Sequence, residues 1–412
     1  MENNISILII ERYSESLADA KVIGNSRKTR NELEIGLVLC QWHHKYTNRK
    51  KICAFIYGNP DTVNNTIVNL NRLRANKAFR QVIPSYVPIS HTQEMTWEKS
   101  VILLDLDGNN NFPSNSFFLS DLVPFEATAN LYFLSEKVGQ LLIILDQWAS
   151  DIYCQPKMIH ISEFTKNIDI EKVKSYLPVP LSSPRIDFGL KDIPSFPNPF
   201  QLFSLVNNLE NAFVKADIGY VNGSLFLDSI IGTDPLIIID WSKFSDHLPR
   251  CIDYSLMEIG LLLALVPPHE KNIWLYEWPS LVNALSEFPI SDEKVSGRLI
   301  PSAISLIKPI REYWKNRSEK NDEISFWLSS VYAGLCFATD SNIEGSTRFA
   351  ATLYSAICYE RVLKILKPSF LDLQPTFIFW PGFNSWKINK KNNITTTSIN
   401  VAILIFFGKF QL

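Results

Sequence analysis

The sequence predicts an α+β protein in which an α/β amino-terminal region precedes a mostly helical carboxy-terminal part. Short apolar runs alternate with polar helical stretches up to about residue 95. A pair of apolar runs follows between residues 225 and 240, and apolar residues recur at helical spacing through most of the remainder. We find no repeat of constant period, so a solenoid or a propeller is not expected.

Composition excludes some classes of function. The chain has 412 residues, of which 46% are hydrophobic and 20% charged, so it can bury the cores of two or three domains. A formal net charge of −2 creates no field that would attract nucleic acid, so we expect no nucleic-acid partner. The six cysteines are scattered without CxxC spacing, which favours reduced thiols in a cytoplasmic protein and no zinc site.

The amino-terminal region is expected to run strand, helix, strand, helix. Strands are predicted at residues 5–10 and 51–58, and helices at residues 31–44 and 61–79. The first apolar run is too short, and its flank too acidic, for a signal peptide. No glycine-rich phosphate-binding pattern occurs in this region. We therefore expect residues 1–95 to be an α/β region, either an accessory domain or a divergent amino-terminal lobe.

The remaining elements follow from apolar spacing and proline content. Residues 101–104 indicate a buried strand, and the three- and four-residue apolar steps within residues 121–153 predict one long helix. Residues 155–200 are dense in proline, which predicts irregular chain. Further helices are expected at residues 202–215, 253–265, 299–314, 323–339 and 347–366.

The last part of the chain, residues 367–412, is expected to be an irregular tail. Its apolar run at residues 399–407 is far shorter than the roughly 20 residues that a transmembrane helix needs. We therefore expect no membrane association.

The most informative segment is VNGSLFLDSIIGTDPLIIIDWSKF, residues 221–244. Two apolar runs separated by the turn residues GTDP predict a hairpin. Polar side chains precede the first run and end the second, so we expect them to meet at one patch. Hard oxygen ligands fixed at strand ends suit a site for Mg²⁺ and phosphate. The residues concerned are Asn222, Ser224, Asp228, Ser229 and Asp240.

This segment resembles the aminoglycoside-phosphotransferase branch of the protein-kinase-like superfamily, and more closely the bacterial ternary complex associated domain. The family motif is His-Gly-Asp-Leu, three residues, Asn-Ile-Leu, a hydrophobic strand ending in Ile-Asp-Phe, and a helix that opens with Asp-Leu. The spacing is kept here by Asn222-Gly223-Ser224-Leu225, Ser229-Ile230-Ile231, Leu236 to Trp241, and Asp253. The resemblance covers about residues 100–366. It implies a two-lobed, protein-kinase-like module over residues 96–366 with a mostly helical carboxy-terminal lobe.

The chemical positions of the motif depart from the family pattern. Ser224 stands where the family has the aspartate that accepts the proton of the attacking hydroxyl, and a neutral hydroxyl cannot act as that base. Ser229 replaces a metal-binding asparagine, and Asn222 replaces a histidine that orients the loop. Asp240 remains as a candidate metal ligand. No catalytic position is intact, and ATP and Mg²⁺ are cofactors that the resemblance allows without requiring.

A kinase-like site also needs a strand lysine that contacts the phosphates and a helix glutamate that holds this lysine. The candidate nucleotide-binding residue is Lys21, with Glu32 or Glu34 on the helix expected at residues 31–44. Solvated surface charges are the alternative interpretation of all three residues.

These observations favour a non-catalytic, pseudokinase-like regulatory or scaffolding component. The resemblance implies a bacterial signalling or defence assembly, with protein partners. An atypical Mg²⁺-dependent phosphotransferase acting on a small molecule or a protein is the first alternative, with Asp228 or Asp240 as its base. A helical adaptor without a nucleotide site, in which the motif match is accidental, is the second. The alternatives differ in whether Ser224, Ser229 and Asp240 converge in one cleft.

Overall fold

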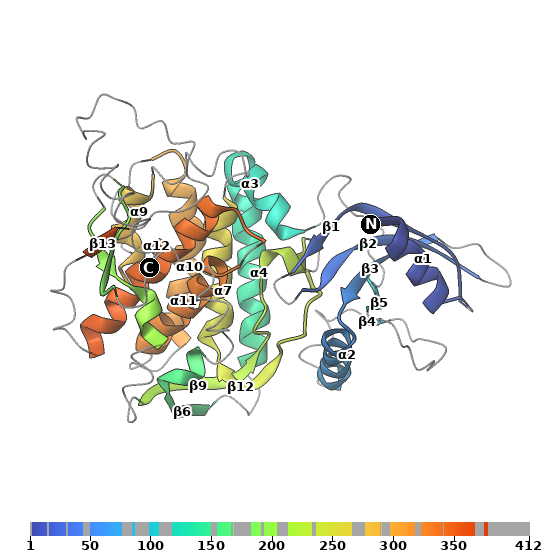
Figure 1. Cartoon of the computed structure of the whole chain (residues 1–412), viewed down its shortest axis with the longest axis horizontal. Coiled ribbons are helices and arrows are strands. Elements are labelled where there is room, and N and C mark those ends of the chain that lie inside the picture. Colours follow the sequence, from blue (N-terminus) through green and yellow to red (C-terminus); the bar gives the residue numbers. More distant parts are fainter. Residues whose placement is uncertain are drawn as a thin grey trace, which may run out of the picture.

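The computed structural model has two parts (Figure 1). A small amino-terminal sheet with helices α1 and α2 lies beside a larger, mostly helical part, so the predicted α+β fold class is confirmed. The structure describes residues 2–377 except residues 15, 30–31, 44–49, 76–84, 87–98, 107–117, 150–154, 166–167, 169–182, 191–192, 204–212, 233–235, 266–276, 289, 291–296, 318–322, 341 and 367–374.

The amino-terminal sheet is antiparallel throughout, which differs from the α/β arrangement expected there. Its strands are ordered β1-β2-β3-β5-β4. The strand expected at residues 101–104 is confirmed as β5, and because β5 pairs with β3 the sheet extends beyond residue 95. The ranges 1–95, 96–366 and 367–412 remain predictions as domains. The strands are β1 (Leu17–Lys28), β2 (Glu34–Trp42), β3 (Lys50–Gly58), β4 (Ser85–Tyr86) and β5 (Ser100–Asp105).

Helix α1 (Glu2–Arg12) replaces the strand expected at residues 5–10, so that prediction was wrong. Its buried side chains Ile5, Leu8 and Ile9 are spaced three and four residues apart, as on one face of a helix. They pack on one face of the sheet. The six-residue apolar run is too short for its period to distinguish a helix from a strand.

Strand β2 replaces the helix expected at residues 31–44, which was also a wrong prediction. Helices cover both faces of the sheet, so neighbouring residues of β2 are buried on opposite sides. Leu37 belongs to the apolar cluster on the α2 side and Val38 to the cluster on the α1 side. A strand buried on both faces has a continuous apolar run, which resembles a buried helix in sequence.

The second half of the amino-terminal prediction is confirmed. The strand expected at residues 51–58 is β3, and the helix expected from residue 61 is α2 (Pro60–Arg74). Asn59 caps α2, because its side-chain oxygen accepts a hydrogen bond from the Asp61 N–H at 2.8 Å. Residues 76–79 of the expected helix lie outside the described residues.

Four helices expected from apolar spacing are present in the helical part, and another expected helix is divided in two. The helices expected at residues 253–265, 299–314, 323–339 and 347–366 are confirmed as α7, α10, α11 and α12. The long helix expected within residues 121–153 is divided into α3 and α4, because Asn130 leaves helical geometry (φ −151°, ψ 68°). The bounds are α3 (Leu119–Ala129), α4 (Leu131–Ala149), α7 (Cys251–Ala264), α9 (Trp278–Leu285), α10 (Ile300–Arg317), α11 (Glu323–Ala338) and α12 (Gly345–Leu366).

Short strands complete this part. The helix expected at residues 202–215 is wrong for its last three residues, which begin strand β9, while residues 204–212 lie outside the described residues. The segment 155–200, expected to be irregular, includes short strands and single 3₁₀ turns where it is described. These strands are β6 (Gln155–His160), β7 (Arg185–Asp187), β8 (Phe196–Pro197), β9 (Phe213–Val221), β10 (Ile230–Ile231), β11 (Ile237–Ile238), β12 (Ser245–Pro249) and β13 (Pro375–Phe377).

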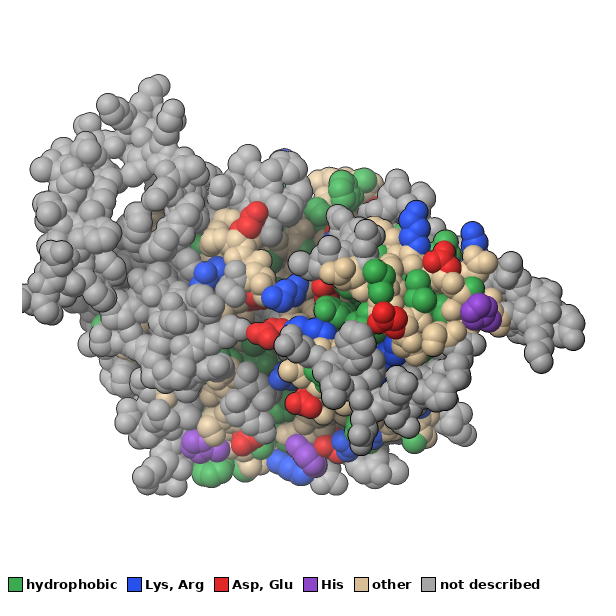
Figure 2. All heavy atoms as spheres, turned by 45° about the vertical axis from the view of Figure 1, so that its right-hand side comes forward, with side chains coloured by type: hydrophobic (Ala, Val, Ile, Leu, Met, Phe, Trp, Pro, Cys, Tyr) green, Lys and Arg blue, Asp and Glu red, His purple; other side chains and the backbone are tan. Residues whose placement is uncertain are grey.

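The tail expected at residues 367–412 is described only at β13, which pairs in parallel with β7. Among the described helices, none combines the length and the apolar character that crossing a bilayer requires. Figure 2 shows acidic and basic side chains mixed across one face of the molecule, without a large area of a single sign among the coloured residues.

Helices α11 and α12 approach each other closely at Gly334. A Cβ there would overlap the Ser355 hydroxyl and lie 3.0 Å from the Ala351 carbonyl oxygen. We expect Gly334→Ala to lower the free energy of unfolding by about 1–3 kcal/mol, because the helices would have to separate. The matched control is Gly139→Ala on α4, where a Cβ would have no neighbour within 4 Å. This control should stabilise the protein by about 0.5–1 kcal/mol, and equal effects in denaturant titrations would contradict the packing argument.

Candidate functional site

The predicted site lies on residues 222–229, called here the motif loop, and on the hairpin that follows it. The expected hairpin is confirmed, because β10 and β11 pair antiparallel with Ile230 opposite Ile238. The loop begins where β9 ends and closes with the short 3₁₀ helix η4 (Leu227–Ser229). The site residues Asn222, Ser224, Ser229 and Asp240 are each at most 1% exposed.

Asp253, on the first turn of α7, holds the start of the motif loop. Its carboxylate oxygens accept hydrogen bonds from the backbone N–H groups of Asn222 at 2.7 Å and Gly223 at 2.9 Å. Gly223 has φ 71°, and a Cβ there would lie 2.8 Å from the Lys243 carbonyl oxygen, so this turn requires glycine. Burial raises the pKa of Asp253 to about 7, against the opposing effect of the two N–H bonds and of Arg250.

Asn222 connects the motif loop to the end of the hairpin. Its side-chain N–H donates to the Asp240 carbonyl oxygen at 2.8 Å, and its side-chain oxygen accepts from the Ser224 N–H at 3.0 Å. Both interactions are with backbone atoms. Asn222 therefore stabilises the shape of the loop, whatever else the site does.

Ser229 and Asp240 are also engaged in local hydrogen bonds. The Ser229 hydroxyl donates to the carbonyl oxygens of Phe226 at 2.8 Å and Ser224 at 3.2 Å. Asp240 accepts from both the N–H (2.9 Å) and the hydroxyl (2.7 Å) of Ser242 through Oδ1, which is the turn-capping geometry typical of aspartate after a strand. Asp240 stays a candidate metal ligand. Within the part of the chain that the structure describes, no three His, Cys, Asp or Glu residues are grouped as a metal site.

The structure does not place Lys21 beside a glutamate of a following helix, as the sequence predicted. It lies exposed on β1 opposite Leu39 of β2, and Glu34 lies opposite Lys28, seven residues further along β1 (28 − 21). Lys21 and Glu34 are therefore roughly 20 Å apart along the strand. Glu32 lies in the turn before β2 with φ 59°, not on a helix.

The strand and helix that could supply a lysine–glutamate pair are β3 and α2, which follow each other directly. The lysines of β3 are its first two residues, and one of them, Lys51, forms an ion pair with Asp105 of β5. The interior of β3 is apolar and includes the fully buried Ile56. Helix α2 contains no glutamate. Because residues 31–44 were expected to be a helix, the sequence alone paired Lys21 with Glu32 or Glu34 and did not point to β3 and α2.

Helix α2 is attached to the chain that follows Asp240. The Asn69 side chain donates to the Trp241 carbonyl oxygen at 2.8 Å. Arg72 forms an ion pair with Asp246, and its guanidinium lies 5.7 Å from the centre of the Phe244 ring. Helix α2 of the amino-terminal part therefore contacts the larger part through polar groups.

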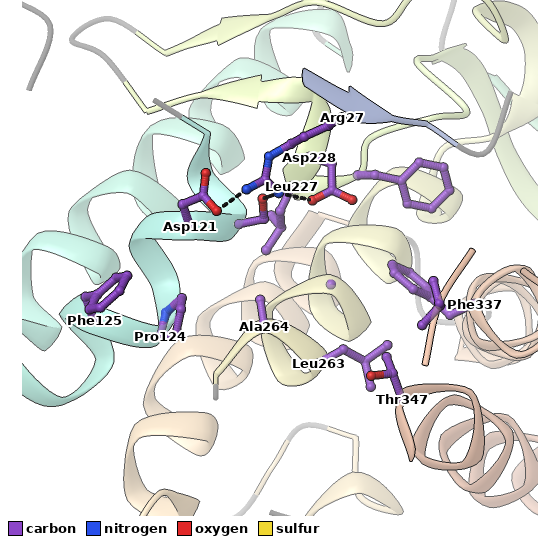
Figure 3. A pocket seen from close by; sticks show the side chains of 14 residues that line it. Arg27, Asp121, Pro124, Phe125, Leu227, Asp228, Leu263, Ala264, Phe337 and Thr347 are labelled. Atoms are coloured by element: carbon purple, nitrogen blue, oxygen red, sulfur yellow. Dashed lines mark hydrogen bonds and ion pairs between the residues drawn. The ribbon is translucent and has the colours of Figure 1, made fainter. Parts of the chain in front are cut away.

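A second contact between the two parts lies at the mouth of a pocket (Figure 3). Arg27, from the end of β1, points toward Asp121 of α3 and Asp228 of η4. Its guanidinium forms an ion pair with Asp121, lies 3.2 Å from the Asp228 carboxylate and donates to Ser120 at 2.9 Å. The sequence predicted Asp228 as a possible catalytic base, but it did not indicate that Arg27 or Asp121 belongs to this site. No local sequence pattern predicts a contact between residues that lie so far apart in the chain.

The described residues form a two-part α+β architecture, in which an antiparallel sheet lies beside a mostly helical part. Comparison with known proteins finds no family model and no curated protein that matches this chain. Among solved structures, the chain is similar to an ethanolamine kinase from Plasmodium vivax, with 11% sequence identity, a TM-score of 0.28, and coverage of 83% of this chain and 84% of that one. At this identity and TM-score the match carries no inference about activity, substrate or ligands.

Proposed function

We propose that this chain is a non-catalytic, pseudokinase-like regulatory or scaffolding module. The observation that carries the proposal is the hydrogen bonding of the motif loop. Asn222 and Ser229 bond to backbone groups of their own loop and hairpin, so they act as structural residues. The loop keeps its shape without a general base at Ser224.

The amino-terminal sheet gives independent support. A kinase-like nucleotide site relies on a lysine within the third strand of its sheet and on a glutamate of the helix that follows. Here the only lysines of β3 stand at its first two positions and α2 has no glutamate. Loss of the phosphate-contacting pair in one lobe and of the base in the other favours weak nucleotide binding or none.

An atypical phosphotransferase would need another base, and both candidates have competing roles. Asp228 shares the Arg27 guanidinium with Asp121, and Asp240 accepts two hydrogen bonds from Ser242. Both carboxylates are therefore already engaged in interactions that a general base would have to give up. The second alternative, a purely helical adaptor, does not match the five-stranded sheet.

The role of such a module would be to bind protein partners. The resemblance of the motif segment to the ternary complex associated domain suggests a bacterial signalling or defence assembly. This part of the proposal rests on that resemblance alone.

Calorimetric titration with ATP, with and without Mg²⁺, tests the proposal. We expect no saturable heat up to about millimolar ATP, an affinity limit that corresponds to roughly −4 kcal/mol of binding free energy. Asp240→Ala and its matched control Asp246→Ala should behave like the unmodified protein. Mg²⁺-dependent binding that Asp240→Ala abolishes and Asp246→Ala preserves would overturn the proposal and support the phosphotransferase alternative.

A further inference from the structure

The pocket beneath Arg27 has the size and lining of a small-molecule site. Its volume is about 430 Å³, within the range of roughly 300–1,000 Å³ that is typical of ligand pockets. Three aromatic side chains contribute to the walls, from α3, from the motif loop and from α11: Phe125, Phe226 and Phe337. A lining that is mostly apolar favours a ligand with an apolar body.

Helix α7 contributes the small residues Gly260 and Ala264, as well as Leu263, to one wall of the pocket. Gly260 and Ala264 are four residues apart and therefore share one face of the helix, and both line the pocket. A Cβ at Gly260 would lie 3.2 Å from Leu227 Cγ. A larger side chain at Ala264 would occupy part of the pocket, whereas one at Gly260 would first meet Leu227.

Among the described residues that line the pocket, carboxylates outnumber cationic groups at its mouth. Two carboxylates, Asp121 and Asp228, share the single guanidinium of Arg27. The Asp228 side chain is 49% exposed and that of Asp121 35%, so both can be reached from solvent. An anionic ligand would be repelled there, whereas a hydrogen-bond donor would find an acceptor.

We propose that this pocket binds a small, non-anionic molecule that has an apolar ring system and a single hydrogen-bond donor. The donor is directed at the Asp228 carboxylate. The apolar body lies against the aromatic side chains and above Gly260 and Ala264. The donor lies at the mouth beside Arg27. This inference concerns the pocket alone and is independent of whether the chain binds ATP.

Two fluorescent probes test the chemistry of the ligand. Phenylnaphthylamine is neutral, apolar and has one N–H donor, and anilinonaphthalene sulfonate has the same aromatic skeleton with an added anionic group. We expect saturable binding of the neutral probe, and binding at least about tenfold weaker for the sulfonate, a difference of roughly 1.4 kcal/mol. Asp228→Asn removes the excess charge and should reduce this difference. No saturable binding of the neutral probe, or equal affinity for both probes, would overturn the proposal.

A pocket-filling substitution locates the binding. Ala264→Phe places a ring in the pocket and should weaken the neutral probe by about tenfold or more, because the apolar space is lost. Ala129→Phe is the matched control, since Ala129 is exposed at the end of α3 and does not line the pocket. If thermal melting shows that Ala264→Phe is unfolded, the smaller Ala264→Leu takes its place. Equal affinity of Ala264→Phe and Ala129→Phe for the neutral probe would mean that the probe does not bind in this pocket.

Discussion

Glu258→Gln is expected to lower the free energy of unfolding by about 3–5 kcal/mol, because it leaves the buried charge of Arg311 without its partner. Glu258 of α7 and Arg311 of α10 are both fully buried. Two parallel hydrogen bonds join them, Nε to Oε2 at 2.9 Å and Nη2 to Oε1 at 2.7 Å. The Tyr354 hydroxyl also donates to Glu258 at 2.8 Å, so one substitution disturbs three helices.

The matched control for this prediction is Glu312→Gln, next to Arg311 on the same helix. Glu312 forms an exposed ion pair with Lys308, four residues earlier, at 3.7 Å. Such pairs contribute only about 0.3–0.5 kcal/mol, so urea titrations should separate the two variants clearly. A loss below about 1 kcal/mol for Glu258→Gln would mean that Arg311 finds other partners.

Asp253→Ala is expected to destabilise the protein by about 2–5 kcal/mol near pH 5, since two buried backbone N–H groups lose their acceptor. These are the N–H groups of Asn222 and Gly223 at the start of the motif loop. Denaturant titration measures the effect, and Asp246→Ala, which breaks the partly exposed ion pair with Arg72, should cost less than about 1 kcal/mol. Similar losses in both variants would contradict the role assigned to Asp253.

The effect of Asp253 should depend on pH. Because burial raises its pKa to about 7 from an ordinary 3.8, the folded protein binds the proton more tightly than the unfolded chain does. Its contribution to stability is complete below the ordinary pKa and is lost as pH rises through the raised pKa, with a slope of up to about 1.4 kcal/mol per pH unit. The destabilisation caused by Asp253→Ala should therefore shrink between about pH 5 and pH 8. A constant difference across that range would contradict the raised pKa.

The motif segment could be recognised in sequence because its residues lie close together along the chain. The hairpin of β10 and β11 brings Asp240 back beside the motif loop, as the spacing of the two apolar runs predicted. The sequence could not predict that Ser229 and Asp240 bond to their own turns. That outcome depends on how deeply the helical part buries the loop.

Local pattern in the sequence by itself determined helices α7, α10, α11 and α12, the hairpin, and the serine at position 224 in place of the motif aspartate. Only the tertiary structure decided that residues 5–10 are helical, because that apolar run is too short to show a period, and that β2 is a strand, because burial on both faces removes its alternation. It also brought Arg27 to Asp228, 201 residues away. Contacts across such distances follow from the packing of whole elements, which no short segment encodes.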